Sequence, residues 1–123
     1  MSPEAIKQDF ESALVKHFSF KARLRSFLYG NDSAQAPLRD PDQCGLGQWI
    51  ASRWHGTYAN VPEMRALDHE HRLIHERANE LMDLRLAGRN DEALAGFRDV
   101  QTQADQVVRL LQTIEGKLRT AGV

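Results

Sequence analysis

Four side chains in the sequence are of types that bind transition metals: the single cysteine, Cys44, and three of the histidines. Two of these, His71 and His75, are four residues apart in the string HRLIH, and the third is His17. Residues four apart on a helix lie on the same face, so both imidazoles can share one ion. Three imidazoles and one thiolate suit tetrahedral zinc. These four residues are therefore the candidate zinc ligands.

Two further histidines do not fit this pattern. His69 lies about 160° from His71 around a helix, so it should face solvent. The string HEHRL is not the H-E-x-x-H motif of zinc proteases, because the residue four after His69 is Leu73. His55 does not belong to the pattern formed by the four candidate ligands. We therefore expect neither His55 nor His69 to bind metal.

Each candidate ligand also has an ordinary interpretation. A single inward histidine is more often a hydrogen-bonded core residue, and an H-x-x-x-H pair is often two surface residues. A lone cysteine in a helical core is usually a small, inert apolar side chain. The metal interpretation depends on all four residues occurring where a packed helical bundle would bring them together.

The elements that must position these residues are marked by prolines and glycines. Pro3 can open a first helix, and Gly30 can end it. The polar stretch 30–43 is typical of a loop, although Asp40 and Pro41 at its end can start a short second helix with Cys44 in its first turn. We expect helices over residues 3–28, 41–54, 62–87 and 91–119.

Apolar periodicity predicts which faces of these helices are buried. His17 lies inside the apolar stripe of the first helix, and His71 and His75 lie inside that of the third. Burying an imidazole without a partner would cost roughly 1–3 kcal/mol, so each needs something to bind. The last helix has a heptad seam, formed by Phe97, Val100, Ala104, Val107, Leu111, Ile114 and Leu118. The sequence thus predicts an all-α fold, an antiparallel four-helix bundle in one domain over residues 1–123.

Composition excludes several functions. The chain has 123 residues and a formal charge of -1, without a basic cluster that would bind nucleic acid. No apolar run approaches the ~20 residues of a membrane span, and the N-terminus lacks the pattern of a secretion signal, so we expect a cytoplasmic protein without membrane insertion. The inward stripes lack the Glu residues and E-x-x-H pairs of di-iron enzymes.

At the candidate ligands the sequence resembles the chemoreceptor zinc-binding (CZB) domain family. The family pattern is a histidine on the first helix, a C-x-x-G-x-W segment and an H-x-x-x-H pair on a later helix. Here these are His17, the segment CGLGQW that begins at Cys44 and ends at Trp49, and His71 with His75. The match covers nearly the whole chain in order and spacing, and the ligand positions show no departure from it.

This resemblance implies a four-helix bundle, a zinc site of three histidines and one cysteine, and a homodimer. It also implies a regulatory input to a bacterial chemoreceptor or a diguanylate cyclase, in the same chain or in another. The signal would be zinc itself or an oxidant such as hypochlorous acid. The alternatives are a helical adaptor, metal-free or with a structural zinc, and a metal-dependent enzyme. An enzyme is less favoured because four protein ligands leave no open position for water.

Overall fold

The computed structural model describes residues 2–31 and 34–121, and within these ranges it contains helices and no strand. The elements are α1 (Pro3–Leu28), α2 (Ala36–Arg39), the 3-10 helix η1 (Pro41–Gln43), α3 (Gly45–Trp54), α4 (Glu63–Leu86) and α5 (Asn90–Ala121). The predicted all-α class is confirmed. Of the stretch predicted to be a loop, Asp32 and Ser33 lie outside the described residues.

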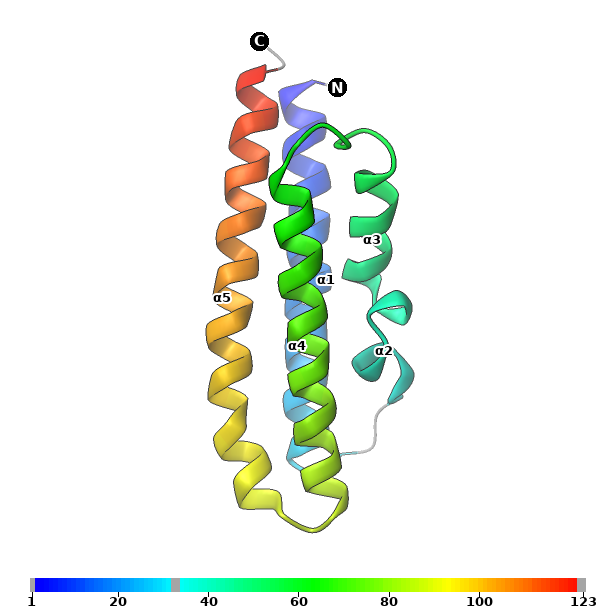
Figure 1. The fold of residues 1–123 in the computed structure, drawn as a ribbon, viewed down its shortest axis with the longest axis vertical. Helices are drawn as coiled ribbons and strands as arrows, with labels where there is room; N and C mark the ends of the chain where they lie inside the picture. The colour runs from blue at the N-terminus through cyan, green and yellow to red at the C-terminus, as the bar shows by residue number, and fades with distance from the viewer. Residues whose placement is uncertain (1, 32–33, 122–123) are drawn as a thin grey trace.

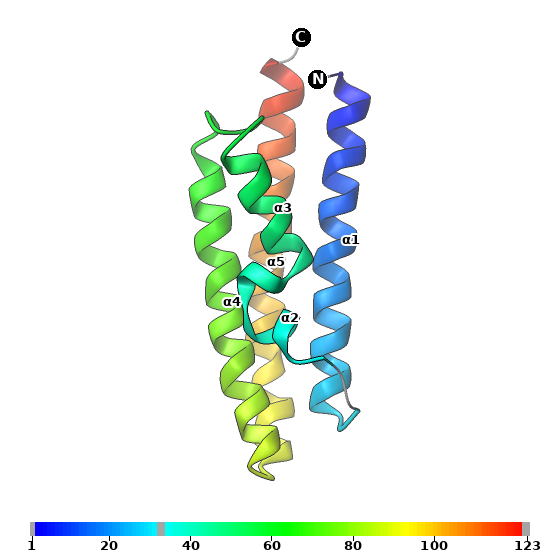
Figure 2. The same ribbon diagram turned by 90° about the vertical axis from the view of Figure 1, so that its right-hand side faces the viewer.

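Three long helices, α1, α4 and α5, lie side by side and form the body of the molecule (Figure 1). The shorter elements α2, η1 and α3 cover one side of this body, where they pack against α1 and α4 (Figure 2). Along the chain α1 and α4 run in one direction, whereas α3 and α5 run in the other. The start of α1 and the end of α5 therefore lie at the same end of the molecule.

The ends of the long helices follow local sequence signals. The Ser2 hydroxyl accepts a hydrogen bond from the Ala5 N–H at 3.1 Å, and Pro3 occupies the first turn of α1. Between α4 and α5 the chain turns at Gly88, whose φ of 82° is a conformation that other residues rarely adopt. The predicted bounds of these helices agree with the structure to within a few residues.

The segment before α3 differs from the prediction. Residues 36–39 lie in a polar stretch of the sequence, yet they form the helix α2. The helix forms there because Leu38 is buried against the long helices. Pro41 opens the 3-10 turn η1, capped by the Asp40 carboxylate, which accepts from the Asp42 N–H at 2.9 Å. Cys44 is then extended (φ -82°, ψ 137°), so the expected helix 41–54 is divided and α3 begins one residue later. Cys44 is the N-cap of α3 and does not lie in its first turn.

The core lies between the three long helices and continues beneath α3. The predicted seam of α5 is buried from Phe97 to Ile114, and Leu118 is half-buried. Among the described residues, none of the helices combines the length with the apolar character that a membrane span requires.

Candidate metal centre

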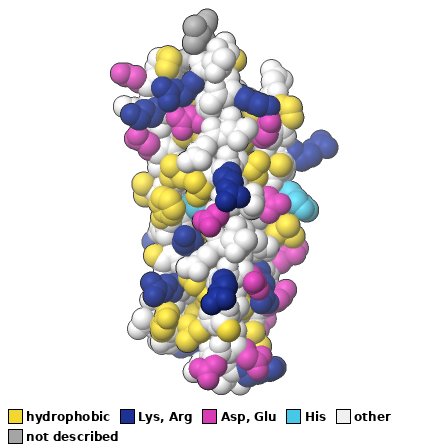
Figure 3. All heavy atoms as spheres, turned by 90° about the vertical axis from the view of Figure 1, so that its left-hand side faces the viewer, with side chains coloured by type: hydrophobic (Ala, Val, Ile, Leu, Met, Phe, Trp, Pro, Cys, Tyr) yellow, Lys and Arg dark blue, Asp and Glu magenta, His cyan; other side chains and the backbone are white. Residues whose placement is uncertain are grey.

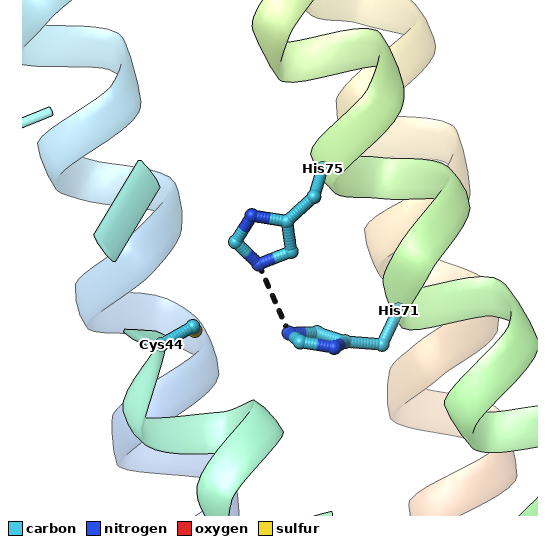
Figure 4. Close-up of side chains that lie close together, drawn as sticks. All are labelled: Cys44, His71 and His75. Carbon is cyan, nitrogen blue, oxygen red and sulfur yellow. Dashed lines mark hydrogen bonds between the residues drawn. The ribbon is translucent and has the colours of Figure 1, made fainter. Parts of the chain in front are cut away.

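Three of the four candidate ligands form one buried cluster. The ligand atoms of Cys44, His71 and His75 all lie within 4.8 Å of one another. Both imidazoles project from α4 toward the thiol, which lies opposite them at the N-terminal end of α3 (Figure 4). None of the three side chains is more than 3% exposed. The cluster therefore joins two helices across the interior.

The hydrogen bonds of His75 define its tautomer. Its Nδ1 lies 2.8 Å from the backbone carbonyl oxygen of Leu38, which can only accept, so Nδ1 carries the proton and donates. Its Nε2 is left with a lone pair and lies 3.1 Å from Nε2 of His71. In the metal-free protein His71 therefore donates this second hydrogen bond. A metal-bound histidine commonly has this arrangement, with its other ring nitrogen donating to a carbonyl.

Burial keeps the imidazoles neutral. It lowers the pKa of His71 to about 3, helped by the neighbouring His75 and His17. Burial also lowers the pKa of His75, against the opposing effect of the Leu38 carbonyl. At neutral pH these rings are uncharged, which is the form that binds metal.

His17 is buried as predicted, but it does not join the cluster. Its Nε2 lies 3.2 Å from the backbone oxygen of Ala104 on α5, to which it donates. Burial lowers its pKa to about 4 although the bond to Ala104 acts to raise it. Like His71, His17 is therefore neutral at neutral pH and able to bind metal. The structure thus brings together three of the four predicted residues, and it buries the fourth with a hydrogen bond to Ala104 on α5.

Gly47 lets the segment that carries Cys44 pack closely. A Cβ atom on Gly47 would lie 1.8 Å from the Pro41 carbonyl oxygen and 3.0 Å from Cε1 of His71. No side chain fits there, so η1 and the His71 ring can both contact the first turn of α3 only because this residue is glycine. The glycine of the C-x-x-G-x-W segment therefore places Cys44 beside α4.

A polar network fixes α2, and with it the carbonyl that orients His75. The Arg39 guanidinium donates to Asn79 at 3.0 Å and to Asp83 at 2.9 Å. The Asn79 amide in turn donates to the backbone oxygens of Arg39 at 2.9 Å and of His75 at 3.0 Å. The supporting roles of Leu38 and Asn79 were not predicted from the sequence. The spacing of Asn79, four residues after His75, was the only available signal.

The residues present fit a zinc ion. Nitrogen and thiolate sulfur are its preferred donors, and two nitrogens at about 2.0 Å in a tetrahedral site lie roughly 3.3 Å apart. The Nε2 atoms of His71 and His75 are already 3.1 Å apart. His55 and His69 are exposed, as expected for residues outside the site.

Comparison with known proteins gives a match to a family model. The family model of the chemoreceptor zinc-binding domain matches residues 17–82, a range that begins at His17 and includes Cys44, His71 and His75. No curated protein and no solved structure gives a match. Because the matched range is more than half of the 123 residues, the chain belongs to the chemoreceptor zinc-binding domain family, which implies a zinc-binding sensory or regulatory role.

Proposed function

We propose that this chain is a single regulatory domain that holds one zinc ion through His17, Cys44, His71 and His75. The observation that supports this most strongly is the buried cluster of one thiol and two neutral imidazoles, which has no carboxylate among its ligand atoms. Imidazole nitrogen and thiolate sulfur are the donors that zinc prefers in proteins. A zinc ion would supply a cross-link between α3 and α4.

For His17 the proposed role is that of fourth ligand. Its Nε2–H donates to the Ala104 carbonyl, so the lone pair is on Nδ1. A ligand histidine that is anchored by a backbone carbonyl has the same hydrogen-bonding pattern as His75 with Leu38. In this proposal α1 joins α3 and α4 at the metal, and α3 is the short fourth member of an antiparallel bundle.

Four protein ligands favour a sensory or structural ion over a catalytic one, because a catalytic zinc keeps a position open for water. Cys44 is the ligand best suited to a switch. It is carried by a helix of only 10 residues, whereas His71 and His75 are carried by one of 24. When Cys44 is released, by zinc loss or by oxidation of the thiolate, the N-terminal end of α3 is free to repack.

The downstream target that we propose is a bacterial chemoreceptor or a diguanylate cyclase module, in the same chain or in another. The domain would thus control chemotaxis or cyclic-di-GMP signalling. We further propose that it acts as a homodimer. Val15 and Phe18 lie three residues apart on α1 and are 68% and 50% exposed, so together they offer apolar surface to a second copy of the chain. Hydrophobic side chains also gather midway along the face shown in Figure 3, with charged groups above and below them.

Metal analysis of the purified full chain tests the proposal. One zinc per chain is the expected result, with dimerisation measured in parallel by light scattering. A chain that binds no zinc at micromolar concentration would be a metal-free adaptor. Two irons per chain would instead indicate a metal-dependent enzyme.

A further inference from the structure

A single carboxylate, that of Asp9 on α1, accepts hydrogen bonds from three side chains outside the metal centre. Its Oδ1 accepts from the Trp49 indole at 3.1 Å. Its Oδ2 accepts from Nε of Arg53 at 2.9 Å and from the Tyr58 hydroxyl at 2.6 Å. Arg53 also forms an ion pair with Oδ1 through Nη2. Asp9 precedes the matched range 17–82, so the family match does not account for it.

This cluster depends on the negative charge of Asp9. The carboxylate is only 11% exposed. Burial acts to raise its pKa, but the hydrogen bonds from Arg53, Tyr58 and Trp49 outweigh this, and the pKa lies below its ordinary value. Charge-assisted hydrogen bonds are about twice as strong as neutral ones. Asp9 is therefore ionised when it accepts the hydrogen bonds of its three partners.

Two of these partners belong to α3, the helix that begins at Cys44. A helix of 10 residues is too short to be stable by itself, so its position depends on tertiary contacts. At its N-terminal end Gly45 faces the stem of Lys16, 3.5 Å from where a Cβ would lie. Toward its C-terminal end Trp49 and Arg53 bind Asp9. Contacts at two levels of α1 thus fix both the position and the direction of α3.

The histidines of the metal centre are held by other means. His71 and His75 belong to α4, which packs along α5, and His75 is oriented by Leu38 of α2. These two imidazoles bond to Leu38 and to each other, and those bonds do not involve Asp9, Trp49 or Arg53. Loosening α3 would therefore move Cys44 and leave the histidine pair in place.

We propose that Asp9 is a positioning residue of the metal centre: by anchoring Trp49, Arg53 and Tyr58 to α1, it places the Cys44 thiolate beside His71 and His75. This inference rests on the proposed zinc site. It assigns to α1 a second connection to the metal, through α3, in addition to the proposed ligand His17.

Cobalt(II) is a suitable probe, because it occupies zinc sites and reports each ligand type separately. A thiolate-to-cobalt charge-transfer band reports Cys44, and the visible d–d bands report tetrahedral binding. The full chain should show both. In Asp9→Asn, which keeps the size of the side chain but removes its charge, we expect the thiolate band to fall by more than half. Affinity should weaken about 10- to 100-fold, the usual effect of losing a residue that supports a ligand.

Two variants serve as controls. Asp9→Glu retains the carboxylate and should restore most of the thiolate band. Asp99→Asn also removes a carboxylate that accepts a hydrogen bond from an arginine of another helix, Arg77 at 2.9 Å. Asp99 lies on α5, however, so this change should alter neither the thiolate band nor the affinity. The result that would overturn the inference is a full thiolate band and unchanged affinity in Asp9→Asn. A wild-type chain that binds no cobalt would instead overturn the proposed zinc site itself.

If Asp9→Asn lowers the helical content of the metal-free protein, Trp49→Phe takes its place. This change removes one hydrogen bond to Asp9 and leaves the charge and most of the aromatic packing, including the edge-on contact with Phe10. We then expect a smaller loss of the same band with normal helicity. An unaltered band in this variant would contradict the positioning role.

Discussion

The Nε2 atoms of His71 and His75 lie 3.1 Å apart, and the hydrogen bond of His75 to Leu38 leaves a single proton between them. That proton belongs to His71. His71 and His75 could both bind one metal ion through Nε2 only without that proton, and His71 would then carry its proton on Nδ1. The separation of the two nitrogens already suits a tetrahedral ion, so this exchange requires little movement of α4.

Loss of any one proposed ligand should weaken zinc binding sharply. Alanine at His17, Cys44, His71 or His75 removes a ligand atom. Replacing a residue that only supports a ligand weakens metal affinity about 10- to 100-fold, and we expect a larger loss of affinity here. Competition with a chromogenic chelator measures the affinity.

The matched control is His69→Ala, two residues from His71 but on the exposed side of α4. Its affinity should remain that of the wild type, as should that of His55→Ala. Equal losses at positions 69 and 71 would contradict the assignment of helix faces. Unchanged affinity in His17→Ala would reduce the site to three protein ligands.

The metal-free protein should lose stability as the pH falls below about 6.5. The pKa of His71 is lowered to about 3 and that of His17 to about 4, from 6.5 in the unfolded chain. Between these values the unfolded state binds more protons, so the free energy of unfolding decreases on acidification, by up to about 1.4 kcal/mol per pH unit for each histidine. Above about pH 6.5 this stability is fully present.

Urea unfolding of chelated protein between about pH 7 and about pH 5 measures this slope, above the range in which most carboxylates titrate. His71→Asn should flatten it, whereas His69→Asn should leave it unchanged. A slope that is the same in all three proteins would show that His71 is not one of its sources.

Alanine at Gly47 should destabilise the protein and weaken metal binding together. The new methyl group would overlap the Pro41 carbonyl and press on the His71 ring, so η1 and α3 must separate. We expect a loss of about 1–3 kcal/mol in the free energy of unfolding, as for other overpacked sites. Thermal unfolding and zinc titration measure the two effects.

Gly116→Ala is the corresponding control on α5. Apart from the backbone of α5 itself, none of the described residues has an atom within 4 Å of the position of its Cβ. The protein should therefore gain about 0.5–1 kcal/mol from the better helix former. Zinc affinity should not change. If Gly47→Ala behaved in the same way as Gly116→Ala, the close approach at Gly47 would have no role in the site.

A two-electron oxidant should release Cys44 from the metal. Conversion of the thiolate to sulfenic acid weakens its bond to zinc, and Trp49, five residues further along α3, should report the movement through its fluorescence. The measurement follows zinc release and tryptophan emission as hypochlorous acid is added in increasing ratio to the zinc-loaded chain.

Cys44→Ser should retain some zinc but lose the response to oxidant. Trp54→Phe removes the second tryptophan and leaves Trp49 as the reporter. Modification of Cys44 without a change in zinc affinity or emission would mean that the metal is structural and that sensing occurs elsewhere.

Periodicity was sufficient to predict the long helices and their buried faces. The stripes that contain His17, His71 and His75 persist over many turns, so the inward direction of each ring followed from geometry alone. The segment from Ala36 to Cys44 was not predictable in the same way. Elements of three or four residues contain no periodic signal. The tertiary burial of Leu38 stabilises α2, and Pro41 with the Asp40 cap forms η1.

The immediate partners of the rings were also beyond sequence reasoning. His17 is bonded to Ala104 and His75 to Leu38, in both cases through a backbone carbonyl, a group that every residue has. Such partners depend on the relative placement of helices, which the side-chain sequence does not encode directly. The anchoring role of Asp9 was missed for the same reason, since its partners lie 40 to 49 residues away.

The position of Cys44 at the N-cap of α3 implies a compromise between stability and function. Natural helices favour serine, threonine, asparagine or aspartate there, because their side chains bond the free N–H groups of the first turn, and losing such a cap costs about 1 kcal/mol. Cys44 makes no side-chain capping bond. A mutational screen that selects only for thermal stability in the absence of metal should therefore favour aspartate or serine at position 44, and it would select against the sensor while improving the fold.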